Sequence, residues 1–561
     1  MKKEHRSESF GVVWLIILLM ALANTFTAFA QVKQATVLVN GISCDLEQGI
    51  LKVEFVTPDV VRVQYTGENT FIGNGTDVCL PRAVDNPVRW VYTPNPDCYL
   101  LKSDSLIVRV DLSTASITYL DKEGGLLLQE DQNIPRISEK RVTKQVIYDE
   151  HSKHIEKTAD GDKEIKNVLR YDTIGHTWKY RINFKWQPLE ALYGWGSHME
   201  DYMNLRGKEL YLCQHNLKAM VPVLNSTAGY GLLFDAGCAM MFKDNSEGSF
   251  VELEAAKQID YYFMKGKTMD AVVANYRMLT GNSPMMPLYL FGYIQSKERY
   301  VSSDDLINTL KEYRQRQIPI DMIVQDWNYW PEGQWGNMSM NPKFYPDKRK
   351  LADEIHSLHA KLMISIWPNA MNCPQHEEFK RKGWLLSGTS VYDAFNPLAR
   401  KLYWNYANNE FFGNGFDAWW CDASEPLDAD WTFMKDGYGA DNHRQRWELN
   451  TNLLNSVLGA ERSQLYSLYH AKGIYENQRS TNEDKRVVNL TRSSYAGQQR
   501  YSTITWNGDT YATWQSFAQM IPAGLNFMAT GCPYWTVDIG AFFTKNGPQW
   551  FWKGDYDKGV A

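Results

Sequence analysis

The chain has 561 residues, which is too long for one hydrophobic core and predicts two or three domains. Its formal net charge of −6 argues against a nucleic-acid-binding protein, because such a partner requires a basic surface. Hydrophobic residues make up an ordinary 44% of the chain, but 20 Trp and 32 Tyr exceed what a core of this size needs. Aromatic rings stack on the apolar faces of sugars, so this excess hints at a carbohydrate ligand.

The first thirty residues have the pattern of a secretory signal. Basic residues lie within the first six positions, an apolar run follows from 12 to 23, and Ala28-Phe-Ala30 precedes Gln31. The run is shorter than the ~20 residues of a membrane span, which favours a signal peptide over an amino-terminal anchor. We predict that residues 1–30 are a signal peptide and that the mature protein has no membrane span. We expect it to be exported to the periplasm or the cell exterior.

The eight cysteines and eleven histidines show no metal-ligand spacing. Neither a C-x-x-C pair nor an H-E-x-x-H motif occurs, so we predict no metal and no cofactor. The scattered cysteines make a dense disulfide framework improbable, although export would permit an isolated bridge.

Residues 31–268 alternate between apolar and polar side chains in short segments, which indicates an antiparallel β-sandwich. Residues 121–125 form a hairpin-like turn, and the charged stretch 136–167 predicts a solvated hairpin or a mobile loop. Glycines in 193–200 and 229–235 are most simply explained by tight turns. The clearest predicted strands are 51–56, 60–65, 106–112, 116–120 and 180–184.

A helix from 269 to about 279 and a Pro-rich link complete a connecting segment, residues 269–287. From 288 to 561, strands alternate with helices and polar residues cluster where each strand ends, which is typical of a (β/α)8-type (TIM) barrel. The predicted strands are 289–294, 320–326, 361–368, 415–422, 486–492, 501–506 and 534–539. Seven strands cannot close such a barrel, so we expect the barrel to be incomplete, without its last strand.

The stretch Gly415-Phe-Asp-Ala-Trp-Trp-Cys-Asp-Ala-Ser-Glu-Pro426 is the centre of this pattern. Side chains alternate along a strand, so Trp420 and Asp422 are predicted to face the barrel interior. Cys421 then packs outward and is inert. An alternative is that Asp422 and Glu425 merely cap the next helix, since acidic residues are favoured there.

The residues at the predicted strand ends form an inventory suited to glycoside hydrolysis. That reaction needs one carboxyl group to protonate the leaving oxygen, another to attack or to activate water, and rings that shape a pocket. No Ser/His pair or phosphate loop competes with this interpretation. The residues are Asp326, Trp327, Trp367, Asp422, Glu425, Arg492, Trp506, Asp509, Trp535, Asp538 and Phe542.

Four motifs in this order resemble glycoside hydrolase family 31, the retaining α-glucosidases and α-xylosidases. The resemblance runs from about residue 193 to the end of the chain, and the motifs are Gln325-Asp-Trp-Asn-Tyr-Trp330, Trp419-Trp-Cys-Asp-Ala-Ser-Glu-Pro426, the segment from Arg492 to Trp506-Asn-Gly-Asp509, and Asp538-Ile-Gly-Ala-Phe-Phe543. Each is weak alone, and their order and spacing make the resemblance specific. The amino-terminal stretch fits the β-sandwich that precedes the barrel in this family.

The resemblance implies roles for individual residues. Asp422 matches the catalytic nucleophile and Asp509 the acid/base. Arg492, or another nearby cation, could keep Asp422 ionised, whereas apolar neighbours such as Trp506 would raise the pKa of Asp509. The matched substrate-binding positions are Asp326, Trp327, Trp367, Trp420, Arg492, Trp506, Asp538 and Phe542, although the rings could instead serve the core. Glu425 is a possible supporting residue, better explained by local hydrogen bonding.

The motif Trp-Trp-Cys-Asp-Ala-Ser-Glu-Pro is more similar to the α-xylosidases of the family, including exported ones that act on xyloglucan fragments, than to its α-glucosidases. The resemblance therefore implies an oligosaccharide substrate with terminal α-linked xylose, with α-glucosidase activity as the alternative. Family members continue past the Asp-Ile-Gly motif with another strand that carries a substrate-contacting histidine. A further alternative is thus a truncated, non-catalytic product that binds sugar. The oligomeric state is left open.

Overall fold

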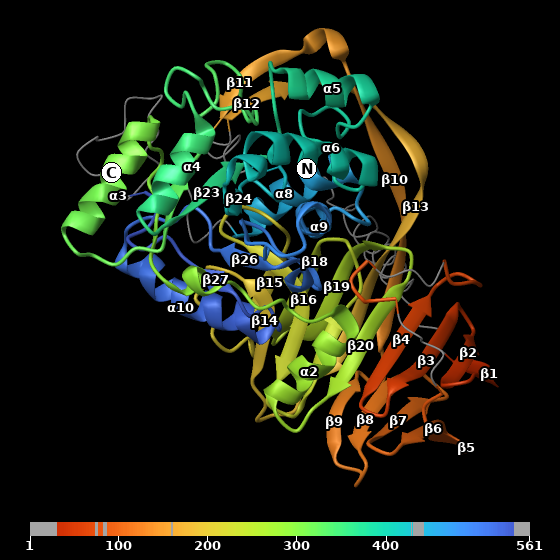
Figure 1. Ribbon diagram of the computed structural model, residues 1–561. Helices are drawn as coiled ribbons and strands as arrows, with labels where there is room; N and C mark the ends of the chain where they lie inside the picture. The colour runs from red at the N-terminus through yellow and green to blue at the C-terminus, as the bar shows by residue number, and fades with distance from the viewer. Residues whose placement is uncertain are drawn as a thin grey trace, which may run out of the picture.

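The computed structural model describes residues 31–72, 77–81, 87–158, 161–427, 429 and 443–543. The predicted signal peptide, residues 1–30, lies outside the described residues. Within them the chain forms an antiparallel β-sandwich, followed by a domain in which parallel strands alternate with helices (Figure 1). Both predicted architectures are confirmed.

One layer of the sandwich is an eight-stranded antiparallel sheet. Side-chain alternation builds it, because apolar residues recur at every second position and point to the shared core. In spatial order its strands are β1 (Val32–Val37), β2 (Gly41–Leu46), β3 (Ile50–Thr57), β4 (Val60–Thr66), β20 (Ile259–Lys265), β17 (Tyr230–Phe234), β16 (Ala219–Ser226) and β14 (Leu192–Ser197).

The second layer is a ten-stranded sheet, also antiparallel. In β7, Leu106, Val108 and Val110 are fully buried and alternate with more exposed neighbours, as the sequence predicts. The strands in order are β15 (Glu209–Leu212), β18 (Met240–Asn245), β19 (Gly248–Ala256), β13 (Val168–Lys185), β9 (Leu126–Glu130), β8 (Ile117–Asp121), β7 (Leu106–Asp111), β6 (Cys98–Ser103) and β5 (Trp90–Pro94), and β10 (Arg136–Tyr148) pairs with β13.

The charged stretch 136–167 is a long hairpin, as predicted. Strands β10 and β13 pair antiparallel from Arg136 to Tyr148, and β11 (His154–Thr158) pairs with β12 (Gly161–Ile165) beyond the short 3₁₀ turn Glu150–Ser152. Figure 1 shows this arm leaving the sandwich and running along the second domain towards α5 (Pro374–Lys382).

The glycines near residue 195 lie in a strand and not in the tight turn that the sequence predicts. Gly194 and Gly196 belong to β14 and have φ values of 126° and 99°. A Cβ on Gly194 would lie 2.3 Å from the carbonyl oxygen of Val223 in the neighbouring strand β16. Glycine is therefore needed because the two strands approach closely in a conformation that other residues rarely adopt.

The second domain contains a seven-stranded, all-parallel sheet in sequential order, the arrangement of a barrel wall. Its strands are β21 (Ile294–Gln295), β22 (Met322–Gln325), β23 (Lys361–Ile366), β24 (Ala418–Cys421), β25 (Asn489–Thr491), β26 (Thr503–Trp506) and β27 (Trp535–Thr536). The first strand begins later than predicted, because Leu288–Phe291 forms a 3₁₀ turn instead. An apolar run of this length does not distinguish a strand from a helical turn.

Helices separate the strands and cover the outside of this sheet (Figure 1). The connecting helix α2 (Met269–Thr280) agrees with its prediction and packs against β20. The barrel helices are α3 (Ser303–Gln315), α4 (Lys348–Ser357), α5, α6 (Pro397–Glu410), α8 (His443–Leu458), α9 (Tyr466–Thr481) and α10 (Trp514–Ala529), with 3₁₀ turns at Phe412–Asn414 and Gln498–Tyr501. No described helix combines the length and apolar character needed to cross a membrane.

The two domains are joined by continuous packing. Phe527 of α10 and Tyr495 belong to the same apolar cluster as the sandwich core. Polar contacts cross the boundary as well: Gly194 N donates to Asn526 Oδ1 at 2.8 Å, and Tyr276 Oη donates to Gln499 Oε1 at 3.0 Å. The sandwich thus lies firmly against the barrel, close to the strand ends where polar residues gather.

Candidate active site

Neighbouring parallel strands place three of the predicted residues at one end of the barrel. Cys421 of β24 pairs with Thr491 of β25, so the residues that follow them, Asp422 and Arg492, leave the sheet side by side. Strand β26 is the next neighbour and leads through Trp506 to Asp509. The carboxyl ends of parallel strands meet at the same edge, which is why residues far apart in sequence converge here.

The predicted alternation along β24 is confirmed. Trp420 faces the barrel interior and lies 5.0 Å from Trp506, measured between ring centroids. Trp419 faces outward, where its Nε1 donates to Gln478 Oε1 of α9 at 2.7 Å. Cys421 is fully buried on the same outer side, and burial raises the pKa of its thiol, so the prediction of an inert cysteine agrees with its surroundings.

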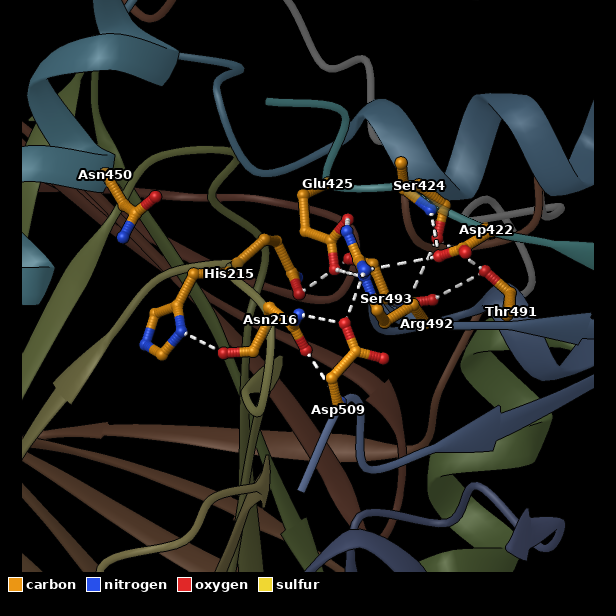
Figure 2. A network of polar contacts seen from close by, with 12 residues as sticks. His215, Asn216, Asp422, Ser424, Glu425, Asn450, Thr491, Arg492, Ser493 and Asp509 are labelled. Carbon is orange, nitrogen blue, oxygen red and sulfur yellow. Dashed lines mark hydrogen bonds and ion pairs between the residues drawn. The ribbon is translucent and has the colours of Figure 1, made fainter. Parts of the chain in front are cut away.

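Arg492 is the centre of the polar network at this end of the barrel (Figure 2). Its Nε lies 2.8 Å from Glu425 Oε1 and its Nη2 lies 3.1 Å from Glu425 Oε2. Glu425 has no exposed side-chain surface, so this bidentate pair balances a buried charge. The sequence predicts hydrogen bonding around the strand end for Glu425, and the structure shows a bidentate pair with Arg492, which follows the neighbouring strand.

The remaining nitrogen of Arg492 contacts both predicted catalytic carboxyl groups. Nη1 lies 3.2 Å from Asp422 Oδ1 and 3.5 Å from Asp509 Oδ2. These two oxygens can therefore be no farther apart than the sum of the distances, about 6.7 Å. Asp422 and Asp509 are thus close enough to act on one small group between them.

Short hydrogen bonds fix the backbone around Asp422. Ala423 N donates to Asp422 Oδ1 at 2.6 Å, and the backbone N–H of Asp422 donates to Ile366 O at 3.1 Å. The hydroxyl groups of Ser424 and Thr491 lie 2.8 Å apart and tie the ends of β24 and β25 together. The carboxyl group of Asp422 thus contacts both Arg492 and its own adjoining backbone.

Asp326 and Asp538 belong to the same electrostatic cluster. Burial raises the pKa of Asp326 well above its usual range, and the charge of Asp422 raises it further. The pKa of Asp538 is raised to about 8, first by burial and then by the charges of Asp509 and Asp422. Like charges in a partly dehydrated site oppose one another's ionisation, so both carboxyl groups favour the neutral form near pH 7.

The predicted aromatic residues divide between core and surface. Trp327 and Trp367 are 7% and 4% exposed and pack with Trp335, whose ring centroid lies 5.2 Å from each of theirs. Trp506 is 2% exposed. The alternative of core packing therefore accounts for much of the surface of these three predicted rings, whereas Trp420 and Phe542 remain partly exposed. Contact with sugar remains a prediction for all of them.

Two residues at this site come from the sandwich and were not predicted from the sequence. They lie in the 213–218 loop, the connection between β15 and β16. Asn216 Nδ2 donates to Asp509 Oδ2 at 2.7 Å, and Gln214 Nε2 donates to the carbonyl of Ser494 at 2.6 Å. Local sequence shows only a polar loop between two strands. The partners in these two contacts are more than 270 positions apart in the chain, so no periodicity or spacing in the local sequence indicates them.

Among the described residues, no group of three or more His, Cys, Asp or Glu side chains is arranged to hold a metal ion. The carboxyl groups at the barrel end are instead organised around Arg492. Carboxyl groups can transfer protons and can act as nucleophiles, so the arrangement offers both functions.

Comparison with known protein families identifies both domains. The description "Glycosyl hydrolase 31 N-terminal galactose mutarotase-like domain" matches residues 50–242, and "Glycosyl hydrolases family 31 TIM-barrel domain" matches residues 283–553.

Curated relatives and solved structures agree with this assignment. An α-xylosidase of Saccharolobus solfataricus is 32% identical over 506 residues, which are 88% of this chain and 63% of the relative. An uncharacterized family 31 glucosidase, ORF2 of Pseudescherichia vulneris, is 31% identical over 66% of this chain and 69% of its own length. The crystal structure of an α-xylosidase from Xanthomonas citri has the same fold, with a TM-score of 0.73 at 22% identity, covering 90% of this chain and 69% of that one.

The raised pKa of Asp538 predicts a pH-dependent effect of Asp538→Asn on stability. An unfolded aspartate titrates near ~3.9, whereas Asp538 in the folded protein titrates at about 8. Between these values the folded protein retains a proton that the unfolded chain has lost, so this group's contribution to stability falls as pH rises. Asparagine does not titrate, so the Asp538→Asn variant should not lose this part of its stability as pH rises. Thermal unfolding followed by circular dichroism should show the variant gaining several degrees over the wild type at pH 8 and little at pH 4.

A stability difference that stays constant from pH 4 to pH 8 would contradict this account of Asp538. Reversal of the trend, with the variant relatively weaker at pH 8, would indicate instead that the folded protein holds Asp538 ionised by an attractive partner.

Proposed function

The chain belongs to glycoside hydrolase family 31, and on that basis we propose that it is a retaining α-glycosidase that releases terminal α-linked xylose from oligosaccharides. The observation that carries the proposal is the pair of contacts from Arg492 Nη1 to Asp422 and Asp509. They limit the separation of the contacted oxygens to about 6.7 Å. This limit admits the about 5–5.5 Å separation of retaining enzymes and excludes most of the about 6.5–9.5 Å range of inverting enzymes.

Asp422 is the nucleophile in this proposal. The guanidinium of Arg492 at 3.2 Å favours its ionised form, and the bond from Ala423 N orients the carboxylate. The carboxylate attacks the anomeric carbon while the bond to the leaving oxygen breaks, which gives a covalent glycosyl-enzyme. Trp420, directly before the strand end, forms part of the wall below the reacting sugar.

Asp509 is the acid/base. It donates its proton to the leaving oxygen, then accepts a proton from the water whose oxygen displaces Asp422 from the sugar. The site favours a protonated acid at rest because Asp422, Glu425 and Asp509 share the positive charge of Arg492, and the neighbouring Asp326 and Asp538 interact electrostatically with these carboxylates. Full ionisation of such a group is electrostatically unfavourable, so protons remain on some members.

The nucleophile assignment is tested with Asp422→Ala in the purified full-length protein. Loss of the attacking carboxylate should lower kcat on an aryl α-xyloside by about a thousandfold or more. Azide fits the space left by the carboxylate and should restore part of the rate by attacking the anomeric carbon. Product analysis by NMR should then show a β-xylosyl azide, since one displacement inverts the configuration.

Glu425→Ala is the matched control, because it removes a carboxylate from the same strand end. Its activity should not recover with azide. Rescue of Glu425→Ala but not of Asp422→Ala would transfer the nucleophile role to Glu425. A wild-type protein that binds xylose without releasing it from any aryl glycoside would favour a non-catalytic sugar-binding protein.

We propose xylose because of the sequence motif around Asp422 and because of the similarity to the α-xylosidases. Glucose differs from xylose by one hydroxymethyl group, whose accommodation or exclusion changes transition-state binding by roughly 1–3 kcal/mol. We expect kcat/KM for a 4-nitrophenyl α-xyloside to exceed that for the α-glucoside by about 10- to 200-fold. A ratio in the opposite direction would make the protein an α-glucosidase, and the second relative is named a family 31 glucosidase.

We also propose that the protein is exported. The support is the basic start, the apolar run at 12–23 and the small residues Ala28 and Ala30. Intact-mass measurement of protein secreted or released from the periplasm should give a mature chain that begins near Gln31. Recovery of the uncleaved chain in the cytoplasm would contradict export.

A further inference from the structure

We propose that Asn216, from the sandwich domain, is the positioning residue for the acid/base Asp509 and determines which carboxyl oxygen transfers the proton. This inference rests on the proposed glycosidase function. Asn216 Nδ2 donates to Asp509 Oδ2 at 2.7 Å, and Asp509 N donates to Asn216 Oδ1 at 3.0 Å. One amide thus holds both the side chain and the backbone of Asp509.

The second of these bonds fixes the orientation of the amide. A backbone N–H can only donate, so the Asn216 atom that faces Asp509 N must be the oxygen. The amide nitrogen therefore faces the carboxyl group. A flipped amide would set two donors against each other and an acceptor against the carboxyl oxygen. The orientation is consequently determined by the chemistry of the pair.

The loop that carries Asn216 is anchored on several sides. Arg446 of α8 is 5% exposed and donates from Nη2 to the carbonyl of Asn216 at 3.0 Å. Lys218 closes the loop with a buried ion pair to Glu200. Gln214 Oε1 accepts from Ser493 Oγ at 2.8 Å, one residue beyond Arg492. These contacts hold Asn216 in place independently of Asp509, which a positioning residue requires.

Gly508, directly before Asp509, allows the 213–218 loop to lie close to this part of the chain. Gly508 has φ of 82°, and a Cβ at this position would lie 2.2 Å from Asn216 Oδ1 and 2.7 Å from Leu217 N. Any other residue would therefore push the 213–218 loop away in addition to straining the backbone. The glycine of Trp506-Asn-Gly-Asp509 is explained by contact with the sandwich loop.

The consequence concerns the proton. Asp509 Oδ2 accepts from Asn216 Nδ2, and Arg492 Nη1 lies 3.5 Å from the same oxygen. Two donors directed at Oδ2 leave the acidic proton on Oδ1. Figure 2 shows that the other carboxyl oxygen of Asp509 is turned away from both donors. Oδ1 is therefore the atom that protonates the leaving oxygen and later takes the proton from water.

The test measures kcat/KM of Asn216→Ala on α-xylosides with leaving groups of different basicity. A very good leaving group such as fluoride or dinitrophenolate departs with little help from an acid, whereas an alkyl or sugar leaving group needs the proton. We expect a loss of less than about threefold on the first kind and of about 30- to 100-fold on the second. Because kcat/KM ends at the first irreversible step, it isolates this proton transfer.

The pH profile gives a second readout. A hydrogen bond to Oδ2 stabilises the ionised form of Asp509, so its loss should move the alkaline limb of kcat/KM upward by about half a unit to one unit. Asn216→Asp, which is nearly isosteric, places a second carboxylate beside Asp509 and should move the limb farther in the same direction. This variant keeps the proposal testable if the alanine protein folds poorly.

Asn225→Ala is the matched control. Asn225 is a buried asparagine of β16 in the same domain, and its Nδ2 donates to the carbonyl of Ala529, not to Asp509. It should lower the unfolding temperature and leave the leaving-group dependence and pH profile unchanged. A uniform loss over all leaving groups in Asn216→Ala, with an unshifted pH profile, would overturn the positioning role. An inactive wild-type protein would instead refute the proposed function.

Discussion

The guanidinium of Arg492 is the interaction around which the site is built. It neutralises the buried Glu425 and reaches Asp422 and Asp509 with its remaining nitrogen. Without this cation, three carboxyl groups would face one another in a partly dehydrated space, where mutual repulsion would prevent their ionisation. Because both proposed catalytic carboxyl groups contact one nitrogen, their contacted oxygens lie within about 6.7 Å of each other.

The carboxyl groups at the barrel end differ in how readily they ionise. Asp422 lies against the cation, whereas burial, followed by the charges of neighbouring carboxylates, raises the pKa of Asp538 and of Asp326. Carboxyl groups of this cluster thus differ in protonation because of their surroundings and not because of residue type.

The sandwich is part of the active site as well as a neighbouring domain. Its 213–218 loop contacts the strand ends on either side of Arg492, through Gln214 to Ser493 and Ser494 and through Asn216 to Asp509. Shared apolar packing with α10 and the polar contacts of Asn526 hold the two domains in this relation. A small displacement of the sandwich would therefore alter the geometry around Asp509 without any change within the barrel.

The sequence by itself determined the features that depend on local periodicity and on chain order. A strand alternates with period two, so Trp420 and Asp422 were placed inside and Trp419 and Cys421 outside, and parallel strands place the residues after them at one edge. The motifs named the family because their order survives in the linear chain. Only the tertiary structure decided that Glu425 pairs with Arg492, that much of the surface of Trp327 and Trp367 is used for packing, and that Asn216 holds Asp509. Those facts depend on contacts between segments up to 293 residues apart, and on the loss of hydration at the barrel end, neither of which leaves a local pattern in the sequence.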